Sequence, residues 1–251
     1  MISVIACSII YFIAVFIFHY CAIRKGPLAT VISKGISSIF FIVIAALAFP
    51  ISCDNGEFMC TFHVGVIVGL VFGLFGDVLL ALRNVFKQKK STFILSGIVA
   101  FAIGHICYLA VIALNMLHIL PDNMLWLSML PVVLGVPIGI TFMKLAPKFN
   151  LDFGKLKAGV CFYGALLATM VLSAIVMGVS DGVQNGFGWF AVVTMLASVL
   201  FVSSDIILSK SYFDKSQKDT SAAMIIAIHV TYYLAQYLFA ISAAGPALFI
   251  S

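Results

Sequence analysis

Two aspartates lie in segments that are otherwise almost entirely apolar. Asp77 occurs in "LFGDVLLAL" (74–82) and Asp205 in "VLFVSSDIILSK" (199–210). A carboxylate in such surroundings costs several kcal/mol unless it is paired, protonated or hydrated. Two carboxyls that share an apolar site divide the roles of acid and base, because burial and like charge keep one of them protonated. Asp77 and Asp205 are therefore candidate catalytic residues for proton transfer without a metal.

The composition places these aspartates in a membrane protein. Of the 251 residues, 63% are hydrophobic and only 9% are charged, whereas about a quarter are charged in a soluble domain. The first apolar stretch is too long for a signal-peptide core and has no basic region before it, which indicates a retained span. Segments of about ten alternating residues, typical of a β-barrel, do not occur. The sequence predicts an all-α integral membrane protein.

Hydrophobic stretches predict eight transmembrane helices, since a span needs about 20 mainly apolar residues. The predicted spans are 2–22, 30–50, 62–82, 92–114, 124–144, 157–179, 187–208 and 221–248. They form a single transmembrane domain over residues 1–251. All 14 Lys and Arg residues lie in or beside the four connections that follow spans one, three, five and seven. The positive-inside rule therefore predicts that these connections are cytoplasmic and that both termini are on the non-cytoplasmic side.

The two aspartates have matched positions in their spans. Asp77 lies six residues before Arg83, and Asp205 lies five residues before Lys210. At ~1.5 Å per residue, both lie about 8–9 Å inside the cytoplasmic end of a helix. Glycines precede Asp77 at a spacing of four residues, which is typical of a face where helices approach closely. We therefore expect Asp77 to point into the bundle.

The spans that follow the two acidic spans carry further candidate substrate-binding residues. His105 and Tyr108 occur in "GHICY", and His229, Tyr233 and Gln236 occur in "HVTYYLAQY". Each histidine also fits a hydrogen-bonded packing role. Because an acid followed by His and Tyr occurs in both halves, the sequence suggests two parallel four-helix repeats, 1–120 and 121–251.

Two carboxyls at one depth suit a reaction that protonates the substrate, forms an oxocarbenium-like intermediate and adds water, as in glycoside hydrolysis. A site near the cytoplasmic side favours a single-chain lipid substrate from that leaflet. The other expected partners are water and membrane lipids. The net charge of +5 marks topology and does not indicate nucleic acid. No metal-ligand spacing or cofactor motif occurs, so we expect no cofactor.

Four stretches resemble, in order and approximate spacing, the signature segments of the YhhN-like family of lysoplasmalogenases: "GLFGDVLLAL", "SGIVAFAIGHICYLA", "VLFVSSDIILSKSYF" and "HVTYYLAQYLFA". The resemblance implies hydrolysis of the vinyl ether bond of lysoplasmenyl-ethanolamine or lysoplasmenyl-choline. The products are a fatty aldehyde and glycerophosphoethanolamine or glycerophosphocholine. It also implies that Asp77 and Asp205 are the catalytic pair, without showing which one delivers the proton and which one activates water.

One departure from the family concerns the start of span two, where members often carry Lys-Pro and this chain has Lys34–Gly35. Lys34 could reach a lipid phosphate or an acid, and Arg83 could bind the phosphate. Both residues also fit simple marking of the cytoplasmic side.

Two other readings stay open. A multi-pass transporter or proton-coupled carrier of a lipid-like solute also suits intramembrane acids and a parallel duplication. Carriers usually bind near the midplane at broken helices, and spans three and seven contain no proline, although Pro131 and Pro137 lie in span five. In a structural or lipid-sensing protein, the acids would only tie helices together. The sequence does not distinguish a bacterial inner membrane from the endoplasmic reticulum.

Cys53 and Cys60 share one outward connection, "CDNGEFMC". They could form a disulfide if that side of the membrane is oxidising.

Overall fold

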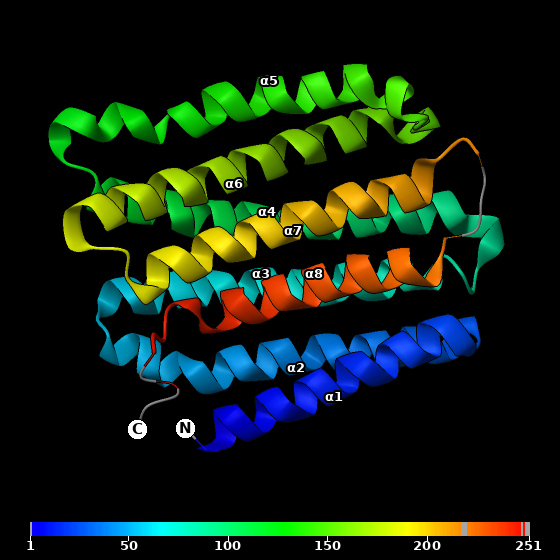
Figure 1. The fold of residues 1–251 in the computed structure, drawn as a ribbon, viewed down its shortest axis with the longest axis horizontal. Coiled ribbons are helices and arrows are strands. Elements are labelled where there is room, and N and C mark those ends of the chain that lie inside the picture. Colours follow the sequence, from blue (N-terminus) through cyan, green and yellow to red (C-terminus); the bar gives the residue numbers. More distant parts are fainter. Residues whose placement is uncertain (1, 217–219, 247, 249–251) are drawn as a thin grey trace. The chain divides into compact units, whose positions relative to one another are not determined.

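The computed structural model describes residues 2–216, 220–246 and 248. Within them, eight α-helices account for most of the chain (Figure 1). They are α1 (Ile2–Arg24), α2 (Pro27–Asp54), α3 (Glu57–Leu82), α4 (Lys90–Ile119), α5 (Leu130–Leu145), α6 (Lys157–Asn185), α7 (Trp189–Phe213) and α8 (Ala222–Ser242). Each is long and apolar enough to cross a membrane, α5 together with the short helices that flank it. The predicted all-α, eight-span class is confirmed.

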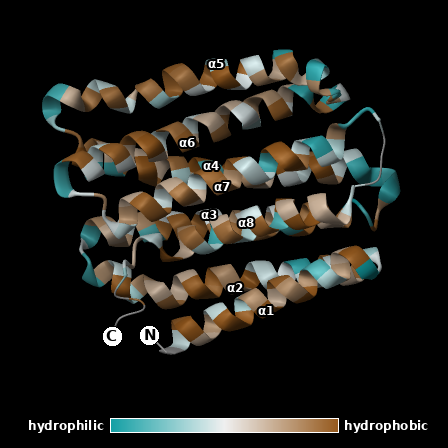
Figure 2. Ribbon diagram, in the orientation of Figure 1, coloured by the Kyte–Doolittle hydropathy of each residue, from teal (hydrophilic) through white to brown (hydrophobic). Residues whose placement is uncertain are grey.

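Hydropathy follows the helices as expected for a chain in lipid. Hydrophilic residues gather at helix ends and connections, while the middle turns are mostly hydrophobic (Figure 2). Large apolar side chains such as Phe16, Val133 and Val183 are also more than half exposed. Exposed apolar side chains along a helix are the surface that a bilayer covers.

The chain forms two compact units. The first unit comprises residues 1–111 and 236–251, and the second comprises residues 112–235. In the first unit, α2 packs against α1 and α3, and in the second unit α6 packs against α5 and α7. In each unit, the helix that carries the aspartate therefore lies beside the helix that precedes it in the chain.

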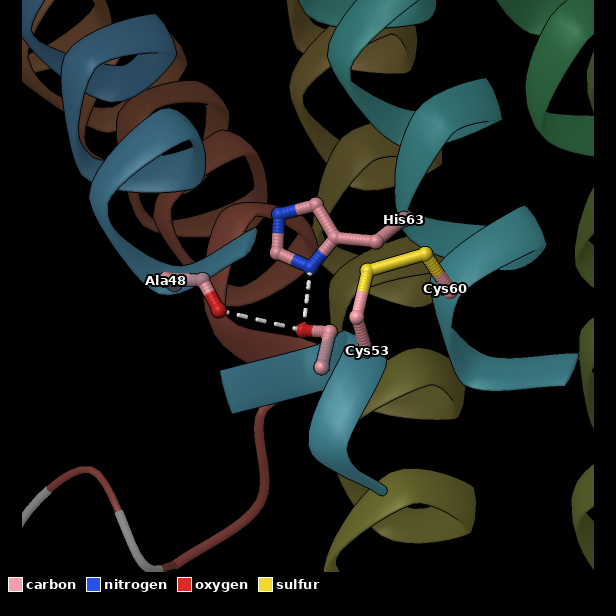
Figure 3. The surroundings of a disulfide bond; sticks show 5 residues. Ala48, Cys53, Cys60 and His63 are labelled. Carbon is pink, nitrogen blue, oxygen red and sulfur yellow. Dashed lines mark hydrogen bonds between the residues drawn. A yellow bond between two sulfur atoms is a disulfide. The ribbon is translucent and has the colours of Figure 1, made fainter. Parts of the chain in front are cut away.

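A disulfide closes the connection between α2 and α3 in the first unit. Cys53 and Cys60 are bonded, and Ser52 and His63 share a hydrogen bond of 2.5 Å beside them (Figure 3). Asn55, in the same connection, donates hydrogen bonds to the carbonyls of Ala243 and Ala244 (both 3.1 Å). These two carbonyls lie in the turn that follows α8, so the connection is hydrogen-bonded to the segment just beyond that helix.

The glycines of α3 are packing positions, as their spacing predicts. A side chain at Gly65 would overlap Val111, and one at Gly69 would overlap the ring of Tyr108. A Cβ at Gly104 of α4 would lie 2.9 Å from the carbonyl oxygen of Gly69. The helices can approach this closely only because Cβ atoms are missing at these positions.

Several predicted span ends differ from the observed helix ends, by up to six residues, and two spans also differ in their local structure. The span predicted at 124–144 begins as a 3-10 helix, Asp122–Ser128, and the α-helix starts at Leu130, where Pro131 occupies the first turn. Proline favours that position because its missing N–H has no partner there. The span predicted at 221–248 ends as a helix at Ser242, and Gly245, with a positive φ of 75°, follows in the turn region beyond it. Pro137 lies inside α5 without ending it.

Candidate active site

The Asp77 carboxylate is bound by two side chains of α2. Its Oδ1 lies 3.0 Å from Nζ of Lys34, and its Oδ2 accepts a hydrogen bond from Oγ of Ser38 at 2.5 Å. Lys34 and Ser38 are one helical turn apart and therefore lie on the same face of α2. All three residues are buried, with 1% of the Asp77 side chain exposed.

On sequence alone, Lys34 is counted with the residues of the connection after the first span. In the structure, Lys34 does not belong to that connection. It lies about two turns inside α2 and contacts an acid, which is one of the alternatives that the sequence left open. A buried carboxylate and a buried ammonium stabilise each other only as a pair, because either one alone keeps its full desolvation cost. Gly35, which replaces the expected proline, lies against Val78 with room for an ordinary Cβ contact at 3.6 Å.

A second group of predicted residues lies in the first unit. Tyr108 donates a hydrogen bond to Oε1 of Gln236 (3.0 Å) and stacks on Phe239 at 4.5 Å. His105 donates from Nδ1 to the carbonyl of Phe101 (2.6 Å). His105, Tyr108 and Gln236 are at most 1% exposed, so they form a packed hydrogen-bonded group.

The other predicted residues lie elsewhere. Arg83 follows the last residue of α3 and is half-buried. His229 and Tyr233 lie on α8 within the second unit, with ring centroids 6.5 Å apart. The structure thus brings Lys34 together with Asp77, and Tyr108 together with Gln236.

The Asp205 carboxyl has a different partner. Its Oδ2 accepts a hydrogen bond of 2.5 Å from the phenol of Tyr163, which lies about two turns inside α6. Tyr163 was not predicted as a site residue. A signal was available, since it is the only tyrosine of α6 and stands, like Lys34, two turns into the helix before an acidic helix.

Asp205 and Tyr163 line a cavity of about 230 Å³ in the second unit. The cavity is formed by α5, α6 and α7. Its other lining residues are apolar apart from Ser209 on α7, and they include Phe142, Leu167, Val171 and Ile206. A hydrogen-bonded carboxyl in a hydrocarbon-lined cavity can deliver a proton to an apolar ligand bound beside it.

Among known proteins, the chain is assigned to a family by its sequence. It matches the YhhN family over residues 29–243, a range that holds all the predicted site residues together with Ser38 and Tyr163. The resemblance inferred from the four stretches is confirmed. No curated protein and no solved structure matches the chain.

Proposed function

Because the chain belongs to the YhhN family, we propose that it is a lysoplasmalogenase, a membrane hydrolase of alkenyl lysophospholipids. Its substrates are lysoplasmenyl-ethanolamine and lysoplasmenyl-choline. The reaction adds water to the vinyl ether bond and releases a fatty aldehyde and glycerophosphoethanolamine or glycerophosphocholine.

The observation that carries this proposal is the position of Asp205 and Tyr163 in the wall of an apolar cavity among membrane-spanning helices. A lysoplasmalogen has one hydrocarbon chain whose first two carbons form the vinyl ether. A site for it needs an apolar cavity and a proton donor beside that cavity. The cavity of the second unit has both.

The first chemical step is proton transfer to carbon. The Asp205 carboxylic acid gives its proton to the β-carbon of the vinyl ether, and the α-carbon becomes an oxocarbenium ion. Its hydrogen-bond partner, Tyr163, is a neutral phenol, so the acid form of Asp205 keeps a hydrogen bond. Proton transfer from a positioned acid typically contributes about 10²–10⁴-fold to a rate.

The second step is the addition of water. We assign to Asp77, the other member of the proposed catalytic pair, the proton of the attacking water; its Oδ1 lies 3.0 Å from the Lys34 ammonium. The oxygen of that water bonds to the α-carbon and gives a hemiacetal. The hemiacetal then breaks its bond to the glycerol oxygen, the proton of its own hydroxyl group passes to that oxygen, and the fatty aldehyde is released. Before the next turnover, Asp77 gives up the proton taken from water and Asp205 takes up a proton from solvent.

A carrier is the competing function, and the helices favour the hydrolase. In carriers, the binding site typically lies where transmembrane helices are unwound. Here α3 runs unbroken through Asp77, and α7 runs unbroken through Asp205.

Aldehyde release by the detergent-purified protein tests the proposal. The substrates are lysoplasmenyl-ethanolamine and lysoplasmenyl-choline, and the saturated ether analogue is the control. We expect aldehyde from the vinyl ethers alone. No aldehyde from a folded wild-type protein would contradict the hydrolase, and proton-coupled uptake in vesicles would then be measured.

Two variants assign the chemistry. Asp205→Asn and Asp77→Asn are each compared with wild type for aldehyde release and for thermal unfolding. We expect Asp205→Asn to be folded and inactive. We expect Asp77→Asn to be inactive and less stable than wild type, because it leaves the buried Lys34 ammonium without its carboxylate. An Asp77→Asn variant that is active would exclude Asp77 as the base.

A further inference from the structure

We propose that Gly164 is a specificity-determining residue, because it leaves the space in which the hydrocarbon chain of a single-chain lysophospholipid lies. The identity of the lipid rests on the proposed function. The size of the side chain at position 164 then decides which chains the cavity admits.

The cavity has two lining glycines, and they are glycine for different reasons. A Cβ at Gly139 of α5 would lie 2.5 Å from the backbone nitrogen of Ala165 on α6, so this glycine lets two helices pack. A Cβ at Gly164 of α6 would meet nothing within 4 Å. Since Gly164 lines the cavity, the open space beside it is the cavity itself.

The cavity follows a long stretch of α6. Its lining residues on this helix run from Val160 to Leu172, a distance of about 18 Å along the axis. Beyond Tyr163 and Gly164, the lining residues of α6 are all apolar. An extended cavity of this kind fits a hydrocarbon chain better than a compact polar solute.

Cations mark one end of the cavity. Lys157 is exposed and lies one turn before the lining residue Val160 on the same face of α6. On α7, Lys210 follows the lining residue Ser209. Asp205 lies five residues before Lys210, which is about 7.5 Å further from this end of the helix along its axis. From this end inward, the order is therefore ammonium groups, carboxyl, and then the apolar wall beside Gly164.

The order of groups in a lysoplasmalogen is the same. Its phosphate comes first, the vinyl ether follows across the glycerol, and the hydrocarbon chain continues from there. A phosphate at this end of the cavity has a charge complementary to that of Lys157, which is exposed, and to that of Lys210, which forms a partly exposed ion pair with Asp214. With the phosphate held there, the vinyl ether lies at the depth of Asp205 and the chain passes Gly164.

Binding of a lipid that cannot react tests this inference separately from hydrolysis. The probe is a radiolabelled, long-chain 1-O-alkyl lysophosphatidylethanolamine, the saturated ether analogue, and its Kd is measured with the full-length protein in detergent. The variant is Gly164→Leu, which places a branched side chain in the cavity. The matched control is Ala158→Leu, which adds the same side chain at an exposed position of α6 outside the cavity.

We expect Gly164→Leu to weaken binding at least tenfold and Ala158→Leu to leave it unchanged. Gly164→Ala and a short-chain analogue complete the series, and the loss should be smaller for the smaller side chain and for the shorter lipid. Unchanged binding in a folded Gly164→Leu protein would overturn the inference, as would a wild type that does not bind the probe.

The two proposals fail differently. If the wild type binds the probe, Gly164→Leu does not, and no aldehyde is released from the vinyl ether, the chain site stands and the hydrolase falls. If aldehyde is released at the wild-type rate by Gly164→Leu, the hydrolase stands and the chain site falls.

Discussion

The two intramembrane aspartates lie in equivalent places but in opposite surroundings. Each is carried by the third helix of its half, and each is bound by a side chain about two turns inside the preceding helix. Asp77 is sealed between an ammonium and a hydroxyl. Asp205 is bound by a phenol and faces a cavity. The same arrangement of an acidic helix beside the preceding helix therefore holds one carboxyl in a charged pair and the other beside a cavity.

This difference distinguishes the two aspartates, which the sequence alone could not assign to the roles of general acid and general base. The Asp77 carboxylate is paired with the Lys34 ammonium, and this pair joins α2 to α3. A carboxyl that meets a neutral donor in an apolar cavity suits an acid. That both act on one substrate stays a prediction.

The largest expected effect is the loss of activity in Asp205→Asn. An amide has no proton of comparable acidity to give, so aldehyde release should fall by about 10²–10⁴-fold. The hydrogen bond from Tyr163 can still be accepted by the amide oxygen, so the thermal unfolding of the variant should match wild type. Activity above one tenth of wild type would remove Asp205 from the role of acid.

Lys34→Met should cause the largest loss of stability. It leaves the Asp77 carboxylate buried without its cation, and removal of one partner of a buried pair costs about 3–5 kcal/mol. The measurement is thermal unfolding in detergent. The double variant with Asp77→Leu should recover most of that stability, because two apolar side chains need no charge partner. A single variant as stable as wild type would show that the pair does not hold α2 and α3 together.

Tyr163→Phe should have a much smaller effect on stability than Lys34→Met. It removes one neutral hydrogen bond, which is worth about 0.5–1.5 kcal/mol. We expect kcat for aldehyde release to fall while KM stays near the wild-type value, since the ring that lines the cavity is kept. If KM rises and kcat is unchanged, Tyr163 contributes to substrate binding and not to proton transfer.

Gly164→Ala should slightly stabilise the protein, whereas Gly139→Ala should destabilise it. Alanine is favoured over glycine in a helix by about 0.8–1 kcal/mol where there is room for its Cβ. At Gly139 the same methyl group overlaps the backbone of α6, and overpacking typically costs about 1–3 kcal/mol. Opposite shifts in melting temperature would confirm the difference between the two cavity glycines.

The second unit has an exposed ion pair, whose contribution to stability can be compared with that of the buried Lys34–Asp77 pair. Lys210 and Asp214 are 3.1 Å apart, with 43% and 23% of their side chains exposed. Hydrogen bonds from the backbone N–H and side chain of Ser216, followed by Lys210, hold the pKa of the Asp214 carboxyl well below its usual value of 3.8.

A depressed pKa fixes the sign of the pH effect. The contribution of Asp214 is complete above its unfolded pKa, from about pH 4 upward, and is lost only as the pH falls through the lower folded pKa. We therefore expect the stability difference between wild type and Asp214→Asn to be small and constant from pH 5 to 8, in about the range of measured surface pairs. A difference that grows with pH across this range would contradict the assignment.

Sequence reasoning predicted the spans and the inward position of Asp77, and it left the pairing of Cys53 with Cys60 as one possibility, which the structure shows. Each of these depends on local pattern, such as the length of an apolar run or a spacing of four residues. The partners of the two acids were harder to predict. Ser38 and Tyr163 depend on how one helix is rotated against the next, and that rotation is set by packing along the whole interface.

Glycine shows the same limit most clearly. Gly139 and Gly164 are alike as letters in apolar segments. In the folded protein, Gly139 faces the backbone of α6, whereas Gly164 faces open space in the cavity. Lys34 was grouped with the cytoplasmic residues because charge marks topology in most loops, but a charge near the end of a span can also turn inward to a partner.

The Lys34–Asp77 pair also bears on how the chain enters a membrane. A lysine or an aspartate at the centre of a lone inserting helix costs about 2.5–3.5 kcal/mol, and one nearer the end costs less. Since α2 packs against α3, the Lys34 ammonium and the Asp77 carboxylate can form their ion pair only when both helices have left the translocon. We expect them to insert as a helical hairpin, with the Cys53–Cys60 bond closing at its tip.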